Sequence, residues 1–406
     1  MTTYLIVGAG LAGAKAAEAI READAEGTVV LVGDEPRAPY ERPDLSKGVL
    51  LGNKTLDELK VVPDEWWAEH DVELVTGDAA TGLDAAARTV TLASGRKVDY
   101  DRLLLTTGAS PRVLDVPGAD LDGVLYLRRA DDNEKLVEVL AAGGSLVVVG
   151  GGWIGLEVAA AARSKGLTVT VVDPRDQPLL GALGAEVGAV WAELHRAQGV
   201  DVRLGVGVTE LRGEGRVTTV VLDDGTELAA DAVLVGVGAE LNLDLAEQGG
   251  LAVDGAVPVD AQLRTSDTNV WAAGDIALAE NAWWGAPLRV EHWANAQDQG
   301  AFAGRAMTGD TAAWGQPPYF FTDQYDAGME YHGHADPSAD ELVLRGDPAS
   351  GEYVAFWRDT QGRVNAAMHV NRWDDSDPLK ALVTARAVVS AERLADPDVP
   401  LADLTP

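Results

Sequence analysis

A glycine-rich turn between an apolar strand and a helix occurs twice in this chain and constrains its fold more than any other feature. The first copy begins with an apolar stretch, Thr3–Val7, which leads into GAGLAG (Gly8–Gly13) and a helix-forming, alanine-rich stretch, Ala14–Ala23. A second apolar stretch, Thr28–Gly33, ends at an acid, Asp34. The order strand, glycine turn, helix, strand and acid predicts one βαβ unit of a parallel sheet.

The second copy repeats this order about 140 residues later along the chain. An apolar stretch, Ser145–Val149, leads into GGGWIG (Gly150–Gly155), and a helical stretch, Leu156–Lys165, follows. A second apolar stretch, Thr168–Val172, again ends at an acid, Asp173. One such motif is also compatible with an ordinary tight turn, but two complete copies indicate two dinucleotide-binding domains.

The spacing of the glycines matches what a pyrophosphate requires. Gly8 makes the tight turn, Gly10 leaves room for phosphate, and Gly13 allows the helix to pack on the sheet with its N-terminus facing the anion. Asp34 is placed to accept a hydrogen bond from a ribose hydroxyl. The second copy has the same set: Gly150, Gly152, Gly155 and Asp173. Two sites in one chain predict a flavin in one and a nicotinamide in the other.

The second acid bears on the choice of nicotinamide coenzyme. A carboxylate at Asp173 favours a ribose 2′-hydroxyl and repels a 2′-phosphate, which predicts NAD rather than NADP. Arg175 lies two residues further on and is placed to reach a phosphate, so NADP stays an alternative.

Charge and cysteine content exclude several classes of function. The chain of 406 residues carries a formal net charge of −33 and has no cysteine. The charge argues against nucleic acid or an anionic membrane as a partner. The missing thiols exclude disulfides, cysteine-ligated iron–sulfur clusters and cysteine redox chemistry. No targeting segment or run of about 18 apolar residues stands out, so we expect a cytoplasmic protein of two or three domains.

The remaining stretches extend this picture. Apolar runs at Arg102–Gly108, Asp231–Gly238 and Asn269–Asp275 predict further strands of the two sheets. Alternating stretches predict hairpins at Arg88–Tyr100 and at Arg216–Leu228. After a predicted helix, Ala294–Met307, the residues from about Tyr319 onward predict a separate α+β domain with a helix at Pro378–Leu394.

Five motifs in order resemble a known family, and the resemblance covers essentially the whole chain. They are PYERPDLSK (39–47), GGGWIGLEVAA (150–160), NVWAAGD (269–275), EHWANAQDQG (291–300) and PYFFTDQYD (318–326). Together they resemble the FAD-dependent NAD(P)H:ferredoxin reductases, the putidaredoxin reductase-like flavoproteins. The resemblance implies an FAD domain at 1–112 and 241–320, an NAD domain at 113–240, and a C-terminal α+β domain at 321–406.

The resemblance also implies a reaction. Hydride passes from NADH to FAD, and electrons then leave singly for a [2Fe–2S] ferredoxin that serves a cytochrome P450 or another oxygenase. The alternatives keep the FAD and change the acceptor to rubredoxin or, as an NADH oxidase, to O₂. A nucleic-acid-binding or signalling role, known on the same scaffold, conflicts with the acidic charge. We expect a monomer or a homodimer and no metal site, because the His332 and His334 pair lacks a third ligand.

The resemblance assigns the catalytic roles to Lys47 and Glu157, which it implies are joined as an ion pair. A cation there stabilises charge on the reduced flavin, and its partner sets its orientation. The expected FAD contacts are Gly8, Gly10, Ala12, Gly13, Asp34, Arg42, Lys47, Ala80, Gly108, Arg128, Gly274, Asp275, Trp293 and Phe321. The expected NAD contacts are Gly150, Gly152, Ile154, Gly155, Glu157, Asp173, Gly238 and Glu291.

Two of these expectations depend on local details. Trp293 opens the predicted helix after His292, so its backbone N–H is placed to stabilise negative charge on a flavin. Phe321 stands where relatives usually have tryptophan, and Asp44 stands where a second proline is usual. For docking an acidic ferredoxin, we expect either a local basic patch near the flavin edge or mainly apolar and polar contacts. The candidates for the basic patch are Lys54, Lys60, Arg289 and Arg305.

Overall fold

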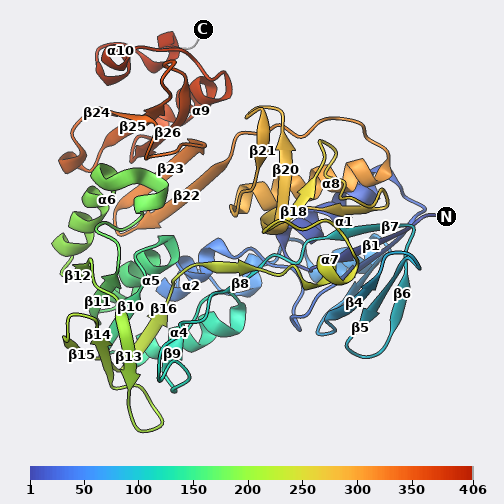
Figure 1. Ribbon diagram of the computed structural model, residues 1–406, viewed down its shortest axis with the longest axis horizontal. Coiled ribbons are helices and arrows are strands. Elements are labelled where there is room, and N and C mark those ends of the chain that lie inside the picture. Colours follow the sequence, from blue (N-terminus) through green and yellow to red (C-terminus); the bar gives the residue numbers. More distant parts are fainter. Residues whose placement is uncertain (405–406) are drawn as a thin grey trace. The chain divides into compact units, whose positions relative to one another are not determined.

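The computed structural model describes residues 1–404, which group into two compact units (Figure 1). The first unit comprises Met1–Glu41, Asp57–Ser110 and Glu240–Pro318. The second unit comprises Arg42–Leu56, Pro111–Ala239 and the chain from Tyr319 onward. The chain enters the second unit three times. It contributes segment 42–56, enters again through β8 (Ala109–Pro111) and leaves through β17 (Ala239–Leu241), and returns at Tyr319.

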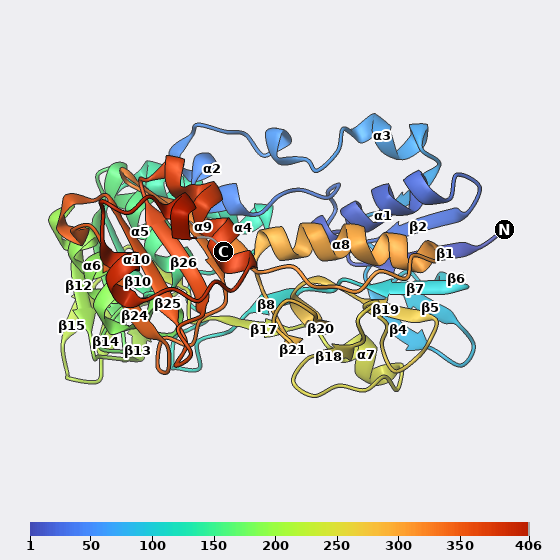
Figure 2. The same cartoon turned by 90° about the horizontal axis from the view of Figure 1, so that it is seen from above.

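The first unit is built on a five-stranded parallel sheet with the strand order β19-β7-β1-β2-β3. These strands are almost continuously apolar, as expected for a sheet covered on both faces. Helix α1 (Leu11–Ala23) follows β1, and α8 (Trp293–Thr308) lies alongside α1 (Figure 2). The strand bounds are β1 (Thr3–Val7), β2 (Thr28–Val32), β3 (Val72–Val75), β7 (Arg102–Leu105) and β19 (Val270–Ala272).

Two small sheets and two short helices complete the first unit. The predicted hairpin at Arg88–Tyr100 is confirmed, because β5 (Thr89–Leu92) pairs antiparallel with β6 (Lys97–Asp99), with β4 (Ala80–Asp84) on the other side of β5. The second small sheet is β18 (Val257–Val259), β20 (Ala277–Asn281) and β21 (Ala286–Leu288), and the helices are α3 (Asp64–Glu69) and α7 (Asp244–Gln248).

The second unit repeats the parallel arrangement, with the strand order β12-β11-β10-β16-β9. Helix α5 (Trp153–Ser164) follows β10 and ends where Gly166 takes a positive φ, as expected of a helix-terminating glycine. The strand bounds are β9 (Val124–Leu125), β10 (Ser145–Val149), β11 (Thr168–Asp173), β12 (Asp201–Leu204) and β16 (Ala232–Val235). The other helices are α2 (Gly48–Leu51), α4 (Ala130–Ala142) and α6 (Leu180–Ala197).

A small antiparallel sheet extends this part of the second unit: β13 (Val208–Arg212), β14 (Thr219–Leu222) and β15 (Glu227–Ala229). It confirms the hairpin predicted at Arg216–Leu228, with Gly225 at positive φ in the turn. Such a turn favours glycine because other residues are strained there.

The C-terminal part of the second unit is a five-stranded antiparallel sheet with the order β22-β23-β26-β25-β24. Its middle strands, β25 and β26, are buried almost throughout. The strand bounds are β22 (Tyr319–Gln324), β23 (Ala327–Gly333), β24 (Glu341–Arg345), β25 (Tyr353–Arg358) and β26 (Val364–Val370). The helices are α9 (Ser376–Thr384) and α10 (Ala391–Ala395).

The single helix predicted at Pro378–Leu394 is wrong, because two helices occupy this stretch. Helix α9 ends where Arg386 adopts a left-handed backbone with φ 45°. The N–H of Arg386 then donates to the carbonyl of Val383, and that of Ala387 donates to Leu382. This pair of bonds terminates a helix, and the chain continues into a bridge with Arg363 instead.

The predicted α/β fold class, with two Rossmann-like parallel sheets and a C-terminal α+β region, is confirmed. The division into three domains at 1–112 with 241–320, 113–240 and 321–406 stays a prediction. Within residues 1–404, every helix is too short or too polar to cross a bilayer.

Candidate functional site

The first glycine turn, in the first unit, joins β1 to α1 and gives each glycine a different role. Gly8 has φ +115°, and a Cβ there would lie 2.1 Å from the carbonyl oxygen of Thr106. A Cβ on Gly13 would lie 2.1 Å from the carbonyl oxygen of Gly8. A Cβ on Gly10 would meet no atom within 4 Å, although Gly10 is the N-cap of α1. Gly8 and Gly13 are therefore required by packing, whereas Gly10 leaves space.

This space lies at an N-terminus suited to an anion. No side chain caps α1 and no acid lies in its first turn, so its free backbone N–H groups and the helix dipole favour a negative charge. The geometry fits the pyrophosphate of a dinucleotide. Helix α8 packs closely on the same helix, since a Cβ on Gly300 would lie 2.2 Å from the carbonyl oxygen of Ala12. Gly300 was missed by the sequence analysis, although its spacing from Gly304 signals close helix packing.

The other expected FAD residues of the first unit lie on several elements. Asp34 is exposed just after β2, and Asp275 is half-buried in a short turn after β19, so both lie at the carboxyl edge of the parallel sheet. Gln299 accepts from the N–H of Gly274 at 2.9 Å and holds that turn. Gly108 takes φ 64° after β7, Ala80 begins β4, and Trp293 is the first residue of α8 after the N-cap His292.

The second glycine turn, in the second unit, has the same geometry. Gly150 has φ +109°, and a Cβ there would lie 2.3 Å from the carbonyl oxygen of Gly236. A Cβ on Gly155 would lie 2.1 Å from the carbonyl oxygen of Gly150. Gly152 is the N-cap of α5, has no side-chain cap, and would place a Cβ 4.0 Å from its nearest neighbour. This N-terminus therefore fits a second dinucleotide.

Asp173 makes contacts that the motif did not predict. Its carboxylate accepts from the N–H of Gly151 at 2.6 Å and from the backbone N–H and side chain of Arg175. The Asp173 side chain is 1% exposed, whereas that of Arg175 is 45% exposed. Burial alone would raise the pKa of Asp173, but the hydrogen bonds from Arg175 and Gly151 lower it. The carboxylate therefore braces the glycine turn itself, and its expected contact with a ribose stays a prediction.

Three further expected NAD residues have clear positions. Ile154 lies exposed in the first turn of α5, and Gly238 takes φ +109° after β16 with no atom within 4 Å of a Cβ. Glu291 lies in the first unit and pairs with Arg289, whereas the other NAD candidates lie in the second unit.

The expected ion pair between Lys47 and Glu157 is present in the second unit. The Lys47 Nζ lies 3.1 Å from Glu157 Oε1 and 3.2 Å from Oε2. The two side chains are 10% and 6% exposed, so the pair is largely shielded from water and more strongly coupled than a surface pair. The Lys47 ammonium also lies 5.3 Å from the ring centroid of Phe321, within the range of a cation–π contact.

Two hydroxyl groups complete the surroundings of Glu157. Ser46 donates to Oε2, and Thr322 donates to Oε1 at 2.6 Å. With the two bonds from Lys47, the carboxylate accepts from three side chains on two segments of the chain, 42–56 and β22. Neither hydroxyl was predicted, although Ser46 and Thr322 lie within two of the motifs, PYERPDLSK and PYFFTDQYD, because the motifs assign them no role.

Segment 42–56 is tied to the second unit by several contacts. Arg42 donates to the backbone oxygen of Arg128, which brings these two expected FAD residues together. Asn133 Nδ2 donates to the carbonyl of Leu45 at 2.6 Å, and Lys165 Nζ donates to that of Leu51 at 2.8 Å. Arg42, Lys47, Arg128 and Phe321 thus belong to the second unit, whereas the other FAD candidates belong to the first.

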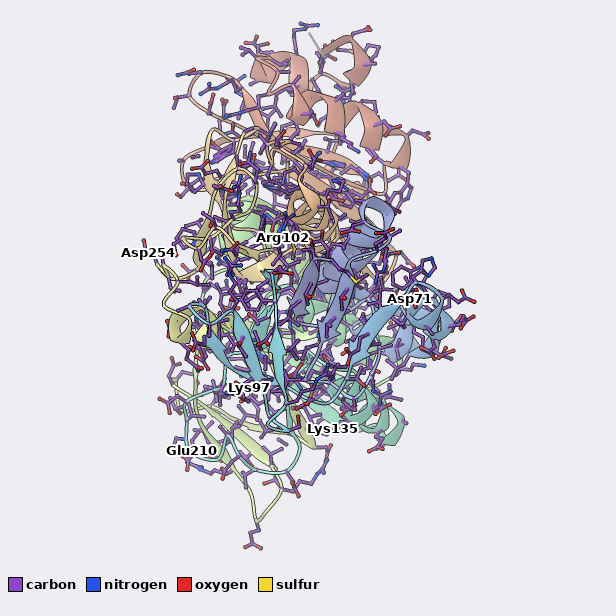
Figure 3. The ribbon with its side chains drawn as sticks, turned by 90° about the vertical axis from the view of Figure 1, so that its right-hand side faces the viewer. Asp71, Lys97, Arg102, Lys135, Glu210 and Asp254 are labelled. Atoms are coloured by element: carbon purple, nitrogen blue, oxygen red, sulfur yellow. The ribbon has the colours of Figure 1, made fainter. Side chains whose placement is uncertain are left out.

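The candidate docking cations do not form a basic patch, because each is paired with an acid. Lys54 pairs with Asp44, Lys60 with Asp57 and Asp64, Arg289 with Glu291, and Arg305 with Asp310. Charged side chains of both signs are spread over the exposed surface, among them Asp71, Lys97, Lys135 and Asp254 (Figure 3). The pairing leaves these four sites close to neutral overall.

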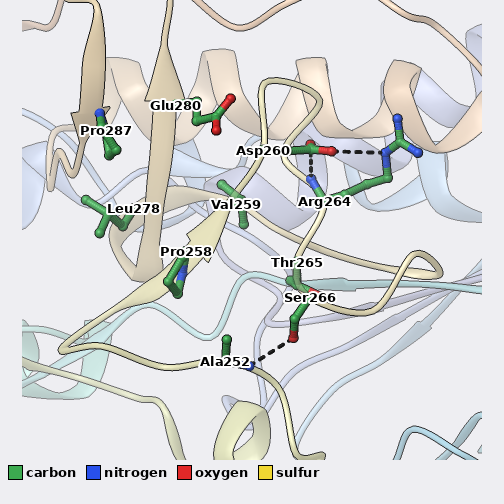
Figure 4. A pocket seen from close by; sticks show the side chains of 10 residues that line it. All are labelled: Ala252, Pro258, Val259, Asp260, Arg264, Thr265, Ser266, Leu278, Glu280 and Pro287. Carbon is green, nitrogen blue, oxygen red and sulfur yellow. Dashed lines mark hydrogen bonds and ion pairs between the residues drawn. The ribbon is translucent and has the colours of Figure 1, made fainter.

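A hollow of about 320 Å³ lies elsewhere in the first unit, beside β18 and β20 (Figure 4). Its charged groups are Asp260, Arg264 and Glu280, and Asp260 is held by Arg264. None of the predicted site residues lines it, so we assign it no role in the reaction.

Comparisons with known proteins agree with this geometry. The model of the pyridine nucleotide-disulphide oxidoreductase family matches residues 2–300, and that of the reductase C-terminal domain matches residues 319–405. Rhodocoxin reductase of Rhodococcus erythropolis is 38% identical over 400 residues, covering 98% of this chain and 93% of that protein. The biphenyl dioxygenase ferredoxin–NAD⁺ reductase component of Paraburkholderia xenovorans is 38% identical over 410 residues, covering 99% and 98%.

Solved structures give the same result. The reductase in the covalent putidaredoxin reductase–putidaredoxin complex matches with a TM-score of 0.95 and 34% identity, covering 99% of this chain and 98% of that chain. The ferredoxin reductase for the CYP199A2 system of Rhodopseudomonas palustris matches with a TM-score of 0.96 and 36% identity over the full length of both chains. The resemblance inferred from the motifs is confirmed: this chain is an oxidoreductase that belongs to the pyridine nucleotide-disulphide oxidoreductase family and carries a reductase C-terminal domain.

Proposed function

We propose that this protein is an FAD-dependent NADH:ferredoxin reductase that passes electrons to a [2Fe–2S] ferredoxin serving a cytochrome P450 or another oxygenase. The observation that carries the proposal is the pair of open helix N-termini, at α1 and α5, in a chain without cysteine. Without a thiol, no disulfide or cysteine-ligated cluster within the chain can receive electrons. The names of the relatives, which are reductases of ferredoxins and of rhodocoxin, support a separate protein acceptor.

The proposed domain division assigns FAD to residues 1–112 and 241–320, NADH to residues 113–240, and the C-terminal domain to residues 321–406. Bound FAD supplies the conversion of a two-electron hydride into single electrons. The N-terminus of α1 holds its pyrophosphate, and the N-terminus of α5 holds that of NADH. We place the reaction in the cytoplasm, where NADH is supplied.

Lys47 and Glu157 are the proposed catalytic pair. The Lys47 ammonium, which is 10% exposed, would supply positive charge to the isoalloxazine of bound FAD, and Glu157 holds that ammonium in position. Phe321 adds an apolar face against the ammonium. We propose NADH rather than NADPH as the donor, because the acid Asp173 stands at the end of β11, although Arg175 neutralises part of its charge.

An anaerobic titration of the purified, FAD-loaded protein with NADH tests the first half of the reaction. We expect the flavin absorption band near 450 nm to bleach with one equivalent of NADH per FAD, and more slowly with NADPH. Absence of bleaching by either coenzyme would contradict the proposal.

A cytochrome c assay with a panel of ferredoxins tests the second half. We expect turnover with NADH to require an added ferredoxin. Ferredoxin-independent reduction of cytochrome c would contradict the proposal, rapid O₂ uptake without a carrier would indicate an NADH oxidase, and turnover only with rubredoxin would indicate a rubredoxin reductase.

A further inference from the structure

A continuous row of hydrogen bonds leads from Glu157 into the interior of the second unit. Thr322 donates to Glu157 Oε1 at 2.6 Å, and Gln324 Nε2 contacts Thr322 Oγ1 at 3.2 Å. His195 Nε2 lies 2.8 Å from Gln324 Oε1, and the Tyr325 hydroxyl lies 3.2 Å from His195 Nδ1. Thr322, Gln324 and His195 are 1%, 1% and 0% exposed. The row therefore has its middle members sealed from bulk water.

The donors of this row all point toward the carboxylate. The amide oxygen of Gln324 can only accept, so His195 carries its hydrogen on Nε2, and Nδ1 accepts from Tyr325. Burial lowers the pKa of His195, which keeps the ring neutral. Each bond polarises the next in the same direction. The hydroxyl of Thr322 therefore donates a stronger hydrogen bond to Glu157 than a threonine hydroxyl that accepts no hydrogen bond itself.

The row and segment 42–56 hold the carboxylate from different parts of the chain. Lys47 and Ser46 reach it from segment 42–56, whereas Thr322 reaches it from β22. Only Oε1 is contacted by the row, and Ser46 contacts Oε2. Rotation of the carboxylate would break bonds on both oxygens, so its plane is fixed relative to the Lys47 ammonium.

We propose that Thr322, supported by Gln324 and His195, is a positioning residue that holds Glu157 and, through it, Lys47 in the geometry required for hydride transfer. This inference rests on the proposed function. Removing the hydroxyl leaves the carboxylate held by Lys47 and Ser46 alone, and small losses of alignment at a reacting centre slow transfer more than they weaken binding.

The decisive variants are Thr322→Val, which keeps the shape and loses the hydroxyl, and Thr322→Ser, which keeps the hydroxyl and loses a methyl group. Stopped-flow reduction of the FAD-loaded protein by NADH gives the limiting rate and the NADH dissociation constant. We expect Thr322→Val to lower the limiting rate about five- to tenfold with less than a twofold change in dissociation constant. We expect Thr322→Ser to stay within about twofold of the wild type. A packing role alone predicts the opposite order, because the serine variant leaves a cavity.

Two further variants complete the set. Gln324→Met interrupts the row one step further back and is expected to slow reduction about two- to fourfold, and it decides the test if Thr322→Val does not retain FAD. Thr209→Val, on the exposed part of β13, is the matched control and should leave the rate unchanged. A limiting rate within twofold of the wild type for both Thr322→Val and Gln324→Met overturns the proposal.

A second readout does not depend on activity. In the flavin-free protein, denaturant unfolding of Thr322→Val, Glu157→Gln and the double variant should show a double-variant loss smaller than the sum of the single losses. Additive losses overturn the proposal. If NADH does not reduce the wild type, the proposed function fails by itself, while the coupling between Thr322 and Glu157 is still measured.

Discussion

Glycine has opposite roles at neighbouring positions of the first turn. At Gly13 a side chain would collide with the backbone of Gly8, whereas at Gly10 it would enter the space at the N-terminus of α1. Substitutions at the two positions therefore separate an effect on packing from an effect on ligand binding.

We predict that Gly10→Ala weakens FAD binding at least tenfold while leaving the flavin-free protein nearly as stable as the wild type. The added methyl group occupies the space proposed for phosphate and touches no protein atom. Gly13→Ala should instead lower the free energy of unfolding by about 1–3 kcal/mol, because its Cβ would lie 2.1 Å from a carbonyl oxygen. Fluorescence titration with FAD and thermal unfolding measure the two effects. Unchanged FAD affinity of Gly10→Ala would contradict the assignment.

Residue roles in this site were predictable where a backbone requirement selects a residue type. The turn glycines Gly8, Gly13, Gly150 and Gly155 are such positions, because a Cβ there would collide with backbone atoms. The partners of Asp173 were not predictable, because a motif specifies that an acid stands there and not which donors reach it. Ser46 and Thr322 were missed for a similar reason: a hydroxyl in a turn or in a strand has no signature in the sequence until its segment is placed against α5.

At the scale of elements, α1 and α8 are held together by glycines rather than by interlocking large side chains. A Cβ on Gly300 would lie 2.2 Å from the carbonyl oxygen of Ala12, and one on Gly304 would lie 2.5 Å from that of Ala16. Two helix backbones can approach this closely only where side chains are absent, so the contact also sets the position of the helix that carries the first nucleotide-binding turn.

We predict that Gly300→Ala lowers the free energy of unfolding by about 1–3 kcal/mol, because overpacking forces the two helices apart. Gly181→Ala in α6 is the matched control, since a Cβ there meets no atom within 4 Å and alanine favours a helix. Denaturant unfolding of the two variants provides the comparison. Equal stability of both would show that the helices can separate at no cost.

A half-buried carboxylate joins four elements of the C-terminal sheet region. Glu330 on β23 contacts His369 on β26 at 3.0 Å and accepts from Tyr319 on β22 at 2.7 Å and from Ser376 on α9. The hydrogen bond from His369, opposed by burial and aided by those from Ser376 and Tyr319, lowers the pKa of Glu330 from 4.5 to about 2.

This pKa predicts an acid-sensitive contribution to stability. Because the folded-state pKa lies below the ordinary one, the contribution is complete above about pH 5 and is lost as the pH falls toward 2. We expect Glu330→Gln to cost roughly 1–3 kcal/mol at pH 7 and to make stability less dependent on pH between 5 and 3. Urea unfolding at several pH values tests this. A variant that loses stability with acid as steeply as the wild type would refute the role of Glu330.

Element boundaries were predictable where glycine marks them and not elsewhere. Gly166 ends α5 and Gly225 turns the β14–β15 hairpin, and both were visible in the sequence. The end of α9 was not, because Arg386 takes the left-handed conformation that usually selects glycine or asparagine. Its cost is offset by the bonds that terminate the helix and by the bridge to Arg363, which depend on the folded sheet.

At the scale of the whole molecule, net charge governs encounters with partners more than it governs the fold. The chain carries −33, and the four cations proposed for docking are each paired with an acid. An acidic ferredoxin therefore approaches against a long-range repulsion, and attraction must come from contacts of short range.

We predict that kcat/KM for an acidic ferredoxin rises about two- to fivefold as ionic strength increases from about 10 to about 150 mM, because the Debye length falls from roughly 30 to 8 Å. The limiting rate of flavin reduction by NADH is the control and should change little, since it follows binding. Steady-state assays at several salt concentrations measure the effect. A fall in kcat/KM with salt would show that an attractive basic patch dominates docking.

The interleaving of the two units has a consequence for how the protein is made. The first unit needs residues up to Pro318, although its first segment ends at Glu41, and the second begins with Arg42–Leu56 but needs the strands after Tyr319. At roughly 5–20 residues per second, the ribosome takes about 15–55 s after Glu41 to synthesise the chain as far as Pro318, where the first unit is complete. For most of that interval the edge of β7 lacks its neighbour β19, and α1 lacks the helix that packs against it, α8. Translation speed and chaperone supply, rather than equilibrium stability, are then expected to set the yield of folded protein.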